Sequence, residues 1–339
     1  MTYSSSVDEA VLSGRTADVY FSRTQSILRA EGLDPVVTME IFPTAEGILC
    51  GISEALDLLK HVLPDDGEVW ALSEGEPMAA KEVVLRITAR YSTFGLYETA
   101  LLGMLSQTSG WATAARKCVD AAQGIPIMNF GARHVHPSVA ARLGYAAVVG
   151  GCVGCATPAG AELAGLDAMG TIPHAMILIF GDAVQATLAF DRHIPPGVNR
   201  VALVDTFKDE AEESLLVAEA LGRKLWGVRL DTPAERGRVT PDLVKEVRAR
   251  LDQAGYPWVK MVVSGGVDAE RIRLFREQGA PVDSFGVGSA ISSAPPIDFT
   301  GDLKVVAGQA IAKRGRIPGI TANPRLKRVD LAQTSAGTP

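Results

Sequence analysis

The stretch from Trp258 to Ser289 constrains the fold most strongly, because it alternates strand, glycine turn, helix, strand and glycine turn. Val259 to Val263 is a short apolar run rich in β-branched residues, which is typical of a strand buried on both faces of a parallel sheet. Asp268 is suited to cap the helix that follows, and Gly279 to end it. The second strand, Val282 to Val287, leads into a second glycine turn.

The two turns are Ser264-Gly265-Gly266 and Gly286-Val287-Gly288. In a parallel barrel, the carboxyl ends of the strands meet at one face. Backbone N–H groups of such turns, helped by a helix N-terminus, cradle phosphate groups there. This unit therefore predicts an α/β barrel and a phosphorylated substrate.

The same rhythm of strand and helix extends over the residues upstream of this unit. Four further strands are predicted at Ile125–Phe130, Ala146–Val153, Val201–Asp205 and Trp226–Asp231. Predicted helices follow at Pro137–Leu143, Pro158–Leu166, Asp209–Leu221 and Pro241–Ala254, the last with Thr240 as its cap, and His174–Phe190 is expected to be mostly helical. Six strands alternating with helices suit a closed barrel of parallel strands.

The first part of the chain has a different pattern. Val36–Phe42, Glu68–Leu72 and Val83–Tyr91 are predicted to be strands, and Leu96–Ala122 a long buried helix. We therefore expect an N-terminal α+β domain over residues 1–122, completed by 293–339, and a barrel domain over 123–292. A chain of 339 residues is long for a single domain, which agrees with two.

Charge and cysteine content exclude several classes of protein. The formal charge of -6, with no long basic run, argues against a nucleic-acid partner. No uninterrupted apolar stretch approaches the roughly 18 residues of a membrane span, and no signal-like start is present, so we expect a cytoplasmic protein. Four cysteines do not make a disulfide framework. Cys152 and Cys155 have the spacing of a metal or redox pair, but without a second pair nearby the signal is weak, and close packing in a glycine-rich turn is the favoured interpretation.

Asp205 and Asp231 end two consecutive predicted strands, and each is followed by a threonine. Polar residues at the carboxyl ends of barrel strands face the active site. Two carboxylates there hold Mg²⁺ through water or bind ribose hydroxyls. The alternative is that each aspartate only caps the next helix or turn.

Arginine and histidine residues occur near the same predicted edge. Arg133 and His134 follow a predicted strand, where a guanidinium suits a carboxylate or phosphate. Arg229 lies inside an apolar strand, which is costly unless it faces a ligand or pairs with a barrel acid. His174 begins an apolar helix, and a lone histidine there is more often structural than catalytic. The motifs of Walker nucleotide sites, Rossmann folds and serine hydrolases do not occur.

An ordered set of motifs resembles the nicotinate phosphoribosyltransferase family, which has the type II phosphoribosyltransferase fold. The motifs cover most of the chain: Asp18-Val19-Tyr20-Phe21, Glu74-Gly75-Glu76-Pro77, Tyr97-Glu98-Thr99, FGARH at 130–134, GTIPH at 170–174, LVDT, VRLDT, VSGG and DSFGVGS. The resemblance implies an incomplete parallel (β/α) barrel beside an N-terminal α+β domain. It also implies a homodimer or higher homo-oligomer in which the partner chain completes each active site.

Members of this family join nicotinate to phosphoribosyl pyrophosphate and release nicotinate mononucleotide and pyrophosphate, a step of NAD biosynthesis and salvage. The resemblance implies a Mg²⁺-dependent enzyme. Catalysis is carried over to His174, Asp205 and Asp231, with both aspartates facing the metal. Substrate binding is carried over to Tyr20, Phe21, Arg133, His134, Thr171, Arg229, Ser264, Gly265, Gly266, Gly286 and Gly288.

Two departures from the family pattern resemble a shorter archaeal and bacterial branch. Thr232-Pro233-Ala234-Glu235 stands where many members have Ser-Gly-Asp, and Arg133-His134 where many have Arg-Arg. His174 matches the histidine that ATP-coupled members phosphorylate, so we expect ATP to stimulate the reaction without being obligatory. Two alternatives stay open: an enzyme that uses quinolinate, and a catalytically silent barrel that binds phosphate.

Overall fold

The computed structural model describes residues 7–331, which form two compact units. Unit 1 comprises residues up to Thr113 and again from Pro295, and unit 2 comprises Ala114–Ala294. The long helix α5 (Glu98–Ala122) contributes to both units. The expected domain boundary at residue 122 falls at the end of this helix, whereas the contacts divide it after Thr113.

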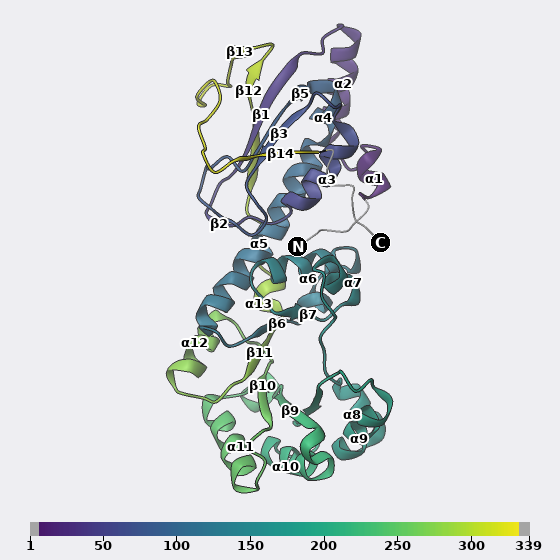
Figure 1. The fold of residues 1–339 in the computed structure, drawn as a ribbon, viewed down its shortest axis with the longest axis vertical. Coiled ribbons are helices and arrows are strands. Elements are labelled where there is room, and N and C mark those ends of the chain that lie inside the picture. The colour runs from purple at the N-terminus through teal and green to yellow at the C-terminus, as the bar shows by residue number, and fades with distance from the viewer. Residues whose placement is uncertain (1–6, 332–339) are drawn as a thin grey trace. The chain divides into compact units, whose positions relative to one another are not determined.

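Unit 1 is built on a six-stranded antiparallel sheet in the order β13-β12-β1-β5-β3-β14 (Figure 1). Its strands are β1 (Val36–Pro43), β3 (Glu68–Ala71), β5 (Leu85–Arg90), β12 (Phe299–Val306), β13 (Gln309–Ala310) and β14 (Lys327–Val329), with β2 (Gly47–Ile48) paired to β4 (Pro77–Met78). Besides α5, its helices are α1 (Glu9–Leu12), α2 (Val19–Ala30), α3 (Ile52–Val62) and α4 (Tyr91–Phe94), with a 3-10 turn at Gly95–Tyr97.

The core of unit 1 lies between this sheet and its helices. Ile41 and Ile87 from the sheet, Leu58 from α3 and Leu101 from α5 are fully buried in one apolar cluster. Burial of such side chains is the dominant favourable term in folding. Strand β12, which follows unit 2 in the sequence, pairs with β1 along its whole length, so residues after unit 2 complete this unit.

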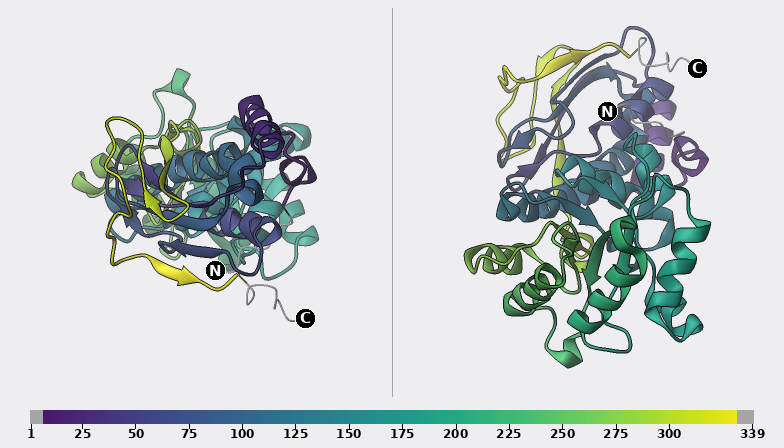
Figure 2. Two further views of the ribbon diagram at one scale, coloured as in Figure 1. Left: turned by 90° about the horizontal axis from the view of Figure 1, so that it is seen from above. Right: turned by 60° about the horizontal axis from the view of Figure 1, so that its bottom comes forward.

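Unit 2 is built on a six-stranded parallel sheet in the order β7-β6-β11-β10-β9-β8. The strands are β6 (Ile127–Asn129), β7 (Gly154–Cys155), β8 (Arg200–Leu203), β9 (Leu225–Leu230), β10 (Lys260–Val263) and β11 (Ser284–Val287). The sheet curls into a half-barrel with β7 and β8 at its two free edges, so the barrel is incomplete and not closed (Figure 2).

Helices follow the strands in the expected α/β order (Figure 1). They are α6 (Pro137–Val149), α7 (Pro158–Leu163), α8 (His174–Phe180), α9 (Ala183–His193), α10 (Glu210–Leu221), α11 (Pro241–Gln253), α12 (Ala269–Glu277) and α13 (Ser289–Ser292), with 3-10 turns at Gly131–His134, Gly222–Lys224 and Ala234–Arg236. The predicted caps are confirmed. Asp268 accepts from Arg271 N at 2.8 Å, and Thr240 caps α11 with Pro241 at its first position.

One predicted strand is wrong. Ala146–Val149 is the last turn of helix α6, and the strand β7 begins only at Gly154. An apolar run of this length does not distinguish a buried helix from a buried strand. The predicted helix over His174–Phe190 is interrupted, because Gly181 adopts a left-handed conformation and Asp182 caps a new helix, α9.

The strand register places Arg229 inside the half-barrel. Arg229 pairs with Leu203 on one side and with Val262 on the other, and paired residues of parallel strands point to the same face of a sheet. The Arg229 side chain therefore leaves the sheet between apolar side chains, and its guanidinium needs polar partners. None of the helices between residues 7 and 331 is long and apolar enough to cross a membrane.

Candidate active site

The two strand-end aspartates lie next to each other at the carboxyl ends of β8 and β9. The backbone N–H of Asp231 donates to Asp205 Oδ2 at 3.0 Å. The Asp205 side chain is fully buried, whereas the Asp231 side chain is 16% exposed to solvent. Both aspartates therefore belong to one polar cluster, as the sequence predicted.

His174, the first residue of α8, belongs to the same cluster. Its Nε2 donates to Asp205 Oδ1 at 2.9 Å, and its side chain is 41% exposed. Each Asp205 oxygen thus has one protein partner. Burial raises the pKa of the Asp205 carboxyl, the bond from His174 opposes that rise, and the nearby negative charge of Asp231 adds to it.

Arg229 holds three side chains of the cluster in place. Its Nε donates to Ser264 Oγ at 2.8 Å, Nη1 to Thr171 Oγ1 at 3.0 Å, and Nη2 to Asp231 Oδ2 at 2.9 Å. Ser264 Oγ in turn donates to Asp231 Oδ1 at 2.7 Å. The barrel ion pair considered for Arg229 is therefore present, and it fixes the orientation of the Asp231 carboxylate.

These contacts define how a metal ion would fit. Both oxygens of Asp205 and both of Asp231 already accept hydrogen bonds from the protein. Over residues 7–331, no group of three or more His, Cys, Asp or Glu side chains is arranged to hold a metal. Mg²⁺ held by these two carboxylates would have to keep several of its waters, because their oxygens already have protein partners.

The first glycine turn lies beside the cluster. Gly265 and Gly266 have φ values of +84° and +65°, which residues with a Cβ rarely adopt. A Cβ on Gly265 would lie 3.1 Å from Asp231 Oδ1, and one on Gly266 would overlap the Arg238 guanidinium. Both positions require glycine, because the backbone is left-handed and because its neighbours approach closely.

The second turn is covered by the loop after β6. A Cβ on Gly286 would overlap the ring of Phe130, and one on Gly288 would lie 3.1 Å from His134 Cε1. The His134 ring is also 3.2 Å from Ser292 Oγ in α13. Arg133, on the same 3-10 turn, is exposed and has no ion pair or hydrogen bond to the described part of the chain.

The two predicted residues of unit 1 lie on α2. Tyr20 is 57% exposed, whereas Phe21 is buried, with the ring centroids 4.4 Å apart. The exposed ring of Tyr20 is therefore accessible for stacking on a ligand. The ring of Phe21 packs against protein, and its predicted role in substrate binding stays a prediction.

Sequence reasoning missed four residues of this region. Phe130 lies 5.2 Å from the Arg229 guanidinium by its ring centroid, and Arg238 covers Gly266. Glu210 and Glu213 in the first turn of α10 are almost fully buried. The acidic start of the predicted helix was visible in the sequence, whereas the burial of Glu210 and Glu213 was not.

The two glutamates hold the loops that follow the aspartates. Glu213 accepts hydrogen bonds from the backbone N–H groups of Thr206, Phe207 and Lys208 at 3.2, 3.0 and 3.2 Å. Glu210 Oε1 accepts from Thr232 Oγ1 at 2.7 Å. One helix turn therefore fixes the residue after Asp205 and the residue after Asp231.

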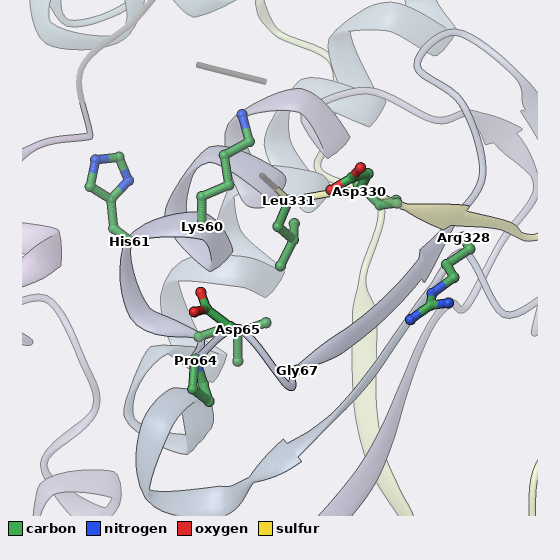
Figure 3. A pocket seen from close by; sticks show the side chains of 10 residues that line it. Lys60, His61, Pro64, Asp65, Gly67, Arg328, Asp330 and Leu331 are labelled. Atoms are coloured by element: carbon green, nitrogen blue, oxygen red, sulfur yellow. The ribbon is translucent and has the colours of Figure 1, made fainter. Parts of the chain in front are cut away.

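Two other features involve none of the residues of this cluster. Cys152 and Cys155 are buried free thiols, and burial raises the pKa of both, which opposes metal or redox chemistry. Unit 1 has a hollow of about 920 Å³ beside Lys60, His61 and Arg328 (Figure 3). None of the residues predicted to bind substrate lines this hollow.

The fold and the cluster define a class of protein: a type II phosphoribosyltransferase architecture with an acidic strand-end site and two glycine turns. Residues 18–109 match the family model of the quinolinate phosphoribosyl transferase N-terminal domain, and residues 111–302 match that of the C-terminal domain. The chain therefore belongs to the quinolinate phosphoribosyl transferase family.

Individual relatives carry related names. The structure of a nicotinate-nucleotide pyrophosphorylase from Pyrococcus furiosus is 45% identical, with a TM-score of 0.86, over 94% of this chain and 82% of that one. A nicotinate phosphoribosyltransferase of Mycobacterium tuberculosis is 31% identical over 73% of this chain and 53% of its own length. One of Bacillus subtilis is 28% identical over 75% and 52%. The chain spans about half the length of these curated relatives.

Proposed function

We propose that this protein transfers the phosphoribosyl group of phosphoribosyl pyrophosphate to nicotinate. The observation that carries the proposal is the bonded set of Asp205, Asp231, Arg229 and Ser264 beside a glycine turn. Such an arrangement suits a phosphorylated sugar, because glycine N–H groups bind phosphate and fixed carboxylates stabilise positive charge on the sugar ring.

The reaction needs positioning and electrostatics and no protein nucleophile. The pyridine nitrogen of nicotinate forms a bond to C1 of the ribose, while the bond from C1 to pyrophosphate breaks and pyrophosphate leaves with the electron pair. The ring carries positive charge as that bond weakens. Carboxylates held rigidly by His174 and Arg229 act on such a charge without reorganising, which is where electrostatic catalysis is most effective.

Of the two arginines predicted to bind substrate, Arg133 is left for the base, which favours a base with one carboxylate. The charge of Arg229 is already matched by Asp231, and exposed Arg133 is free to meet a carboxylate. The names of the curated relatives also support nicotinate. Quinolinate is the second candidate, since the family models carry its name. Its additional carboxylate, lost as carbon dioxide on transfer, would call for further cations.

Three further elements belong to the proposal. Asp205 and Asp231 would hold Mg²⁺ through water, and the ion would supply positive charge against the leaving pyrophosphate. ATP stimulates transfer through phosphorylation of His174 without being required. The enzyme works as a homo-oligomer with shared sites, in the cytoplasm. Acid-labile label on His174 after incubation with γ-labelled ATP tests the second element, and an absolute requirement for ATP would contradict it.

The decisive experiment is a substrate titration. Nicotinate, nicotinamide and quinolinate are each offered with phosphoribosyl pyrophosphate and Mg²⁺, with and without ATP, and both mononucleotide and pyrophosphate are quantified. We expect turnover with nicotinate. Release of carbon dioxide from quinolinate, without turnover of nicotinate, would assign the second candidate. Binding of phosphoribosyl pyrophosphate without any transfer would identify a silent phosphate-binding barrel.

A further inference from the structure

Arg238 lies directly over the first glycine turn. A Cβ on Gly266 would overlap Arg238 Nη1, and it would lie 2.7 Å from Cζ. Arg238 itself has a φ of +65°, in the left-handed region that residues other than glycine rarely adopt. Its backbone N–H donates to Pro233 O at 3.1 Å, which holds the loop in this conformation. Unfavourable backbone of this kind persists only where surrounding contacts such as this one hold it.

The guanidinium of Arg238 has no matching negative charge. Within residues 7–331 its side chain forms no ion pair or hydrogen bond. A second guanidinium, that of Arg271 in α12, lies close enough to be affected: burial lowers the pKa of Arg271, the positive charge of Arg238 lowers it further, and Asp268 opposes both. Arg271 Nη2 donates to Val239 O at 2.6 Å, and its Nε is buried without a partner in the described chain.

Asp268 is the carboxylate that faces this pair of guanidiniums, while the Asp231 carboxylate beside Gly265 is already paired with Arg229, so an excess of positive charge is left at this turn. Like charges held together in a folded protein repel, unless an anion joins them. The turn adds backbone N–H groups, and α12, nine residues long, begins beside it at Ala269. A helix N-terminus attracts anions, so all three features act in the same direction.

We propose that Arg238, with Arg271 behind it, binds the 5′-phosphate of the phosphoribosyl substrate at the Gly265-Gly266 turn. A guanidinium offers paired N–H donors that match two phosphate oxygens, which a lysine does not. Arg238 is thus a binding residue for a phosphate monoester dianion. The inference rests on the proposed function for the identity of the substrate, whereas the phosphate contact is tested without any transfer reaction.

The test measures the dissociation constant of ribose 5-phosphate by calorimetry, in wild type and in Arg238→Gln. We expect binding to weaken by about 10- to 100-fold, as for the loss of a charge-assisted hydrogen-bonded pair. Binding of Mg²⁺-pyrophosphate, measured alone, should change by less than about threefold, because that group belongs to the aspartates. The reverse pattern, with pyrophosphate weakened and ribose 5-phosphate unchanged, overturns the assignment.

Two further variants separate binding from folding. Arg236→Gln removes a cation of the same loop that pairs instead with Glu210 at 3.5 Å, and it should leave ribose 5-phosphate binding unchanged. Arg238→Gly permits the left-handed backbone, so its melting temperature should equal or exceed that of wild type while ribose 5-phosphate binding weakens as in Arg238→Gln. Wild-type binding in folded Arg238→Gly overturns the proposal. Arg238-dependent binding in a protein that transfers nothing overturns only the proposed function.

Discussion

The backbone N–H of Asp231 donates to the Asp205 carboxylate, at 3.0 Å from Oδ2, so the first aspartate fixes the position of the second. The other Asp205 oxygen accepts from His174, and the Asp231 carboxylate is held by Arg229 and Ser264. A substitution at one aspartate should therefore alter the position of the other. The site should respond to substitution as one unit, with effects that are not additive.

Asp205→Asn and Asp231→Asn should each lower kcat by roughly 10²-fold, the scale of losing one preorganised electrostatic contact. An asparagine keeps the shape but lacks the charge that stabilises a positive sugar ring. Steady-state turnover at saturating phosphoribosyl pyrophosphate measures the effect. Asp209→Asn is the matched control, because Asp209 only caps α10 and asparagine caps equally well. Wild-type turnover in both site variants would show that the aspartates are only structural.

Glu213→Gln should lower kcat by about 10- to 100-fold, with little change in KM for phosphoribosyl pyrophosphate, since small displacements of catalytic groups cost rate. The two carboxylate oxygens accept three backbone N–H groups directly after Asp205, and in glutamine an NH₂ group would replace one of these oxygens and face its donor. The separation of kcat from KM distinguishes a positioning residue from a substrate contact.

The control for Glu213 lies on the same helix turn. Glu212→Gln makes the same change of charge at a half-exposed side chain whose ion pair within residues 7–331 is with Lys208. Its kcat should stay at the wild-type value. Equal losses in the two variants, or wild-type kcat in a folded Glu213→Gln protein, would remove Glu213 from the positioning of Asp205.

Much of unit 2 could be predicted from local sequence signals. The strand, turn and helix of residues 259–279 are marked by a β-branched run, a capping aspartate and a closing glycine, all of which act within a few residues. The bond between Arg229 and Asp231 also had a local signal, because residues two apart on a strand share one face.

Other features depend on residues distant in sequence. The burial of Gly286 under Phe130 and the cover of Gly266 by Arg238 arise only when the strands assemble. The Ala146–Val149 segment consists of apolar residues alone, so it has no periodicity that distinguishes a helix from a strand. The segment is helical in the structure, where α6 packs beside α7. Open edges at β7 and β8 follow from sheet order, which no single segment encodes.

Glu98 should make the stability of the protein fall as pH rises. Burial, and to a lesser degree Asp302, raise the pKa of Glu98 to about 7, against the opposing effect of Lys313. A raised carboxyl pKa favours the folded state while the group is protonated. Its contribution is complete below the ordinary value of 4.5 and is lost as pH rises to about 7.

The melting temperature of Glu98→Gln, followed against pH, tests this. The variant is uncharged throughout, so its advantage over wild type should grow between pH 4.5 and about 7 and then level off. Glu46→Gln, at a carboxylate with an exposed side chain, should show no such trend. A constant difference between Glu98→Gln and wild type across this range would show that Glu98 does not titrate there.

His174→Ala should move the acidic limb of the pH–rate profile to higher pH. The hydrogen bond and charge of His174 lower the pKa of Asp205 against the effect of burial, so their loss lets that pKa rise. Asp205 must be ionised to stabilise a positive sugar ring, and in the variant it would be protonated at pH values where wild type is active.

The measurement is kcat/KM against pH for both proteins, without ATP. His193→Ala, at an exposed residue ending α9, should keep the wild-type profile. A fully active His174→Ala enzyme with an unshifted limb would show that this histidine only packs beside the site.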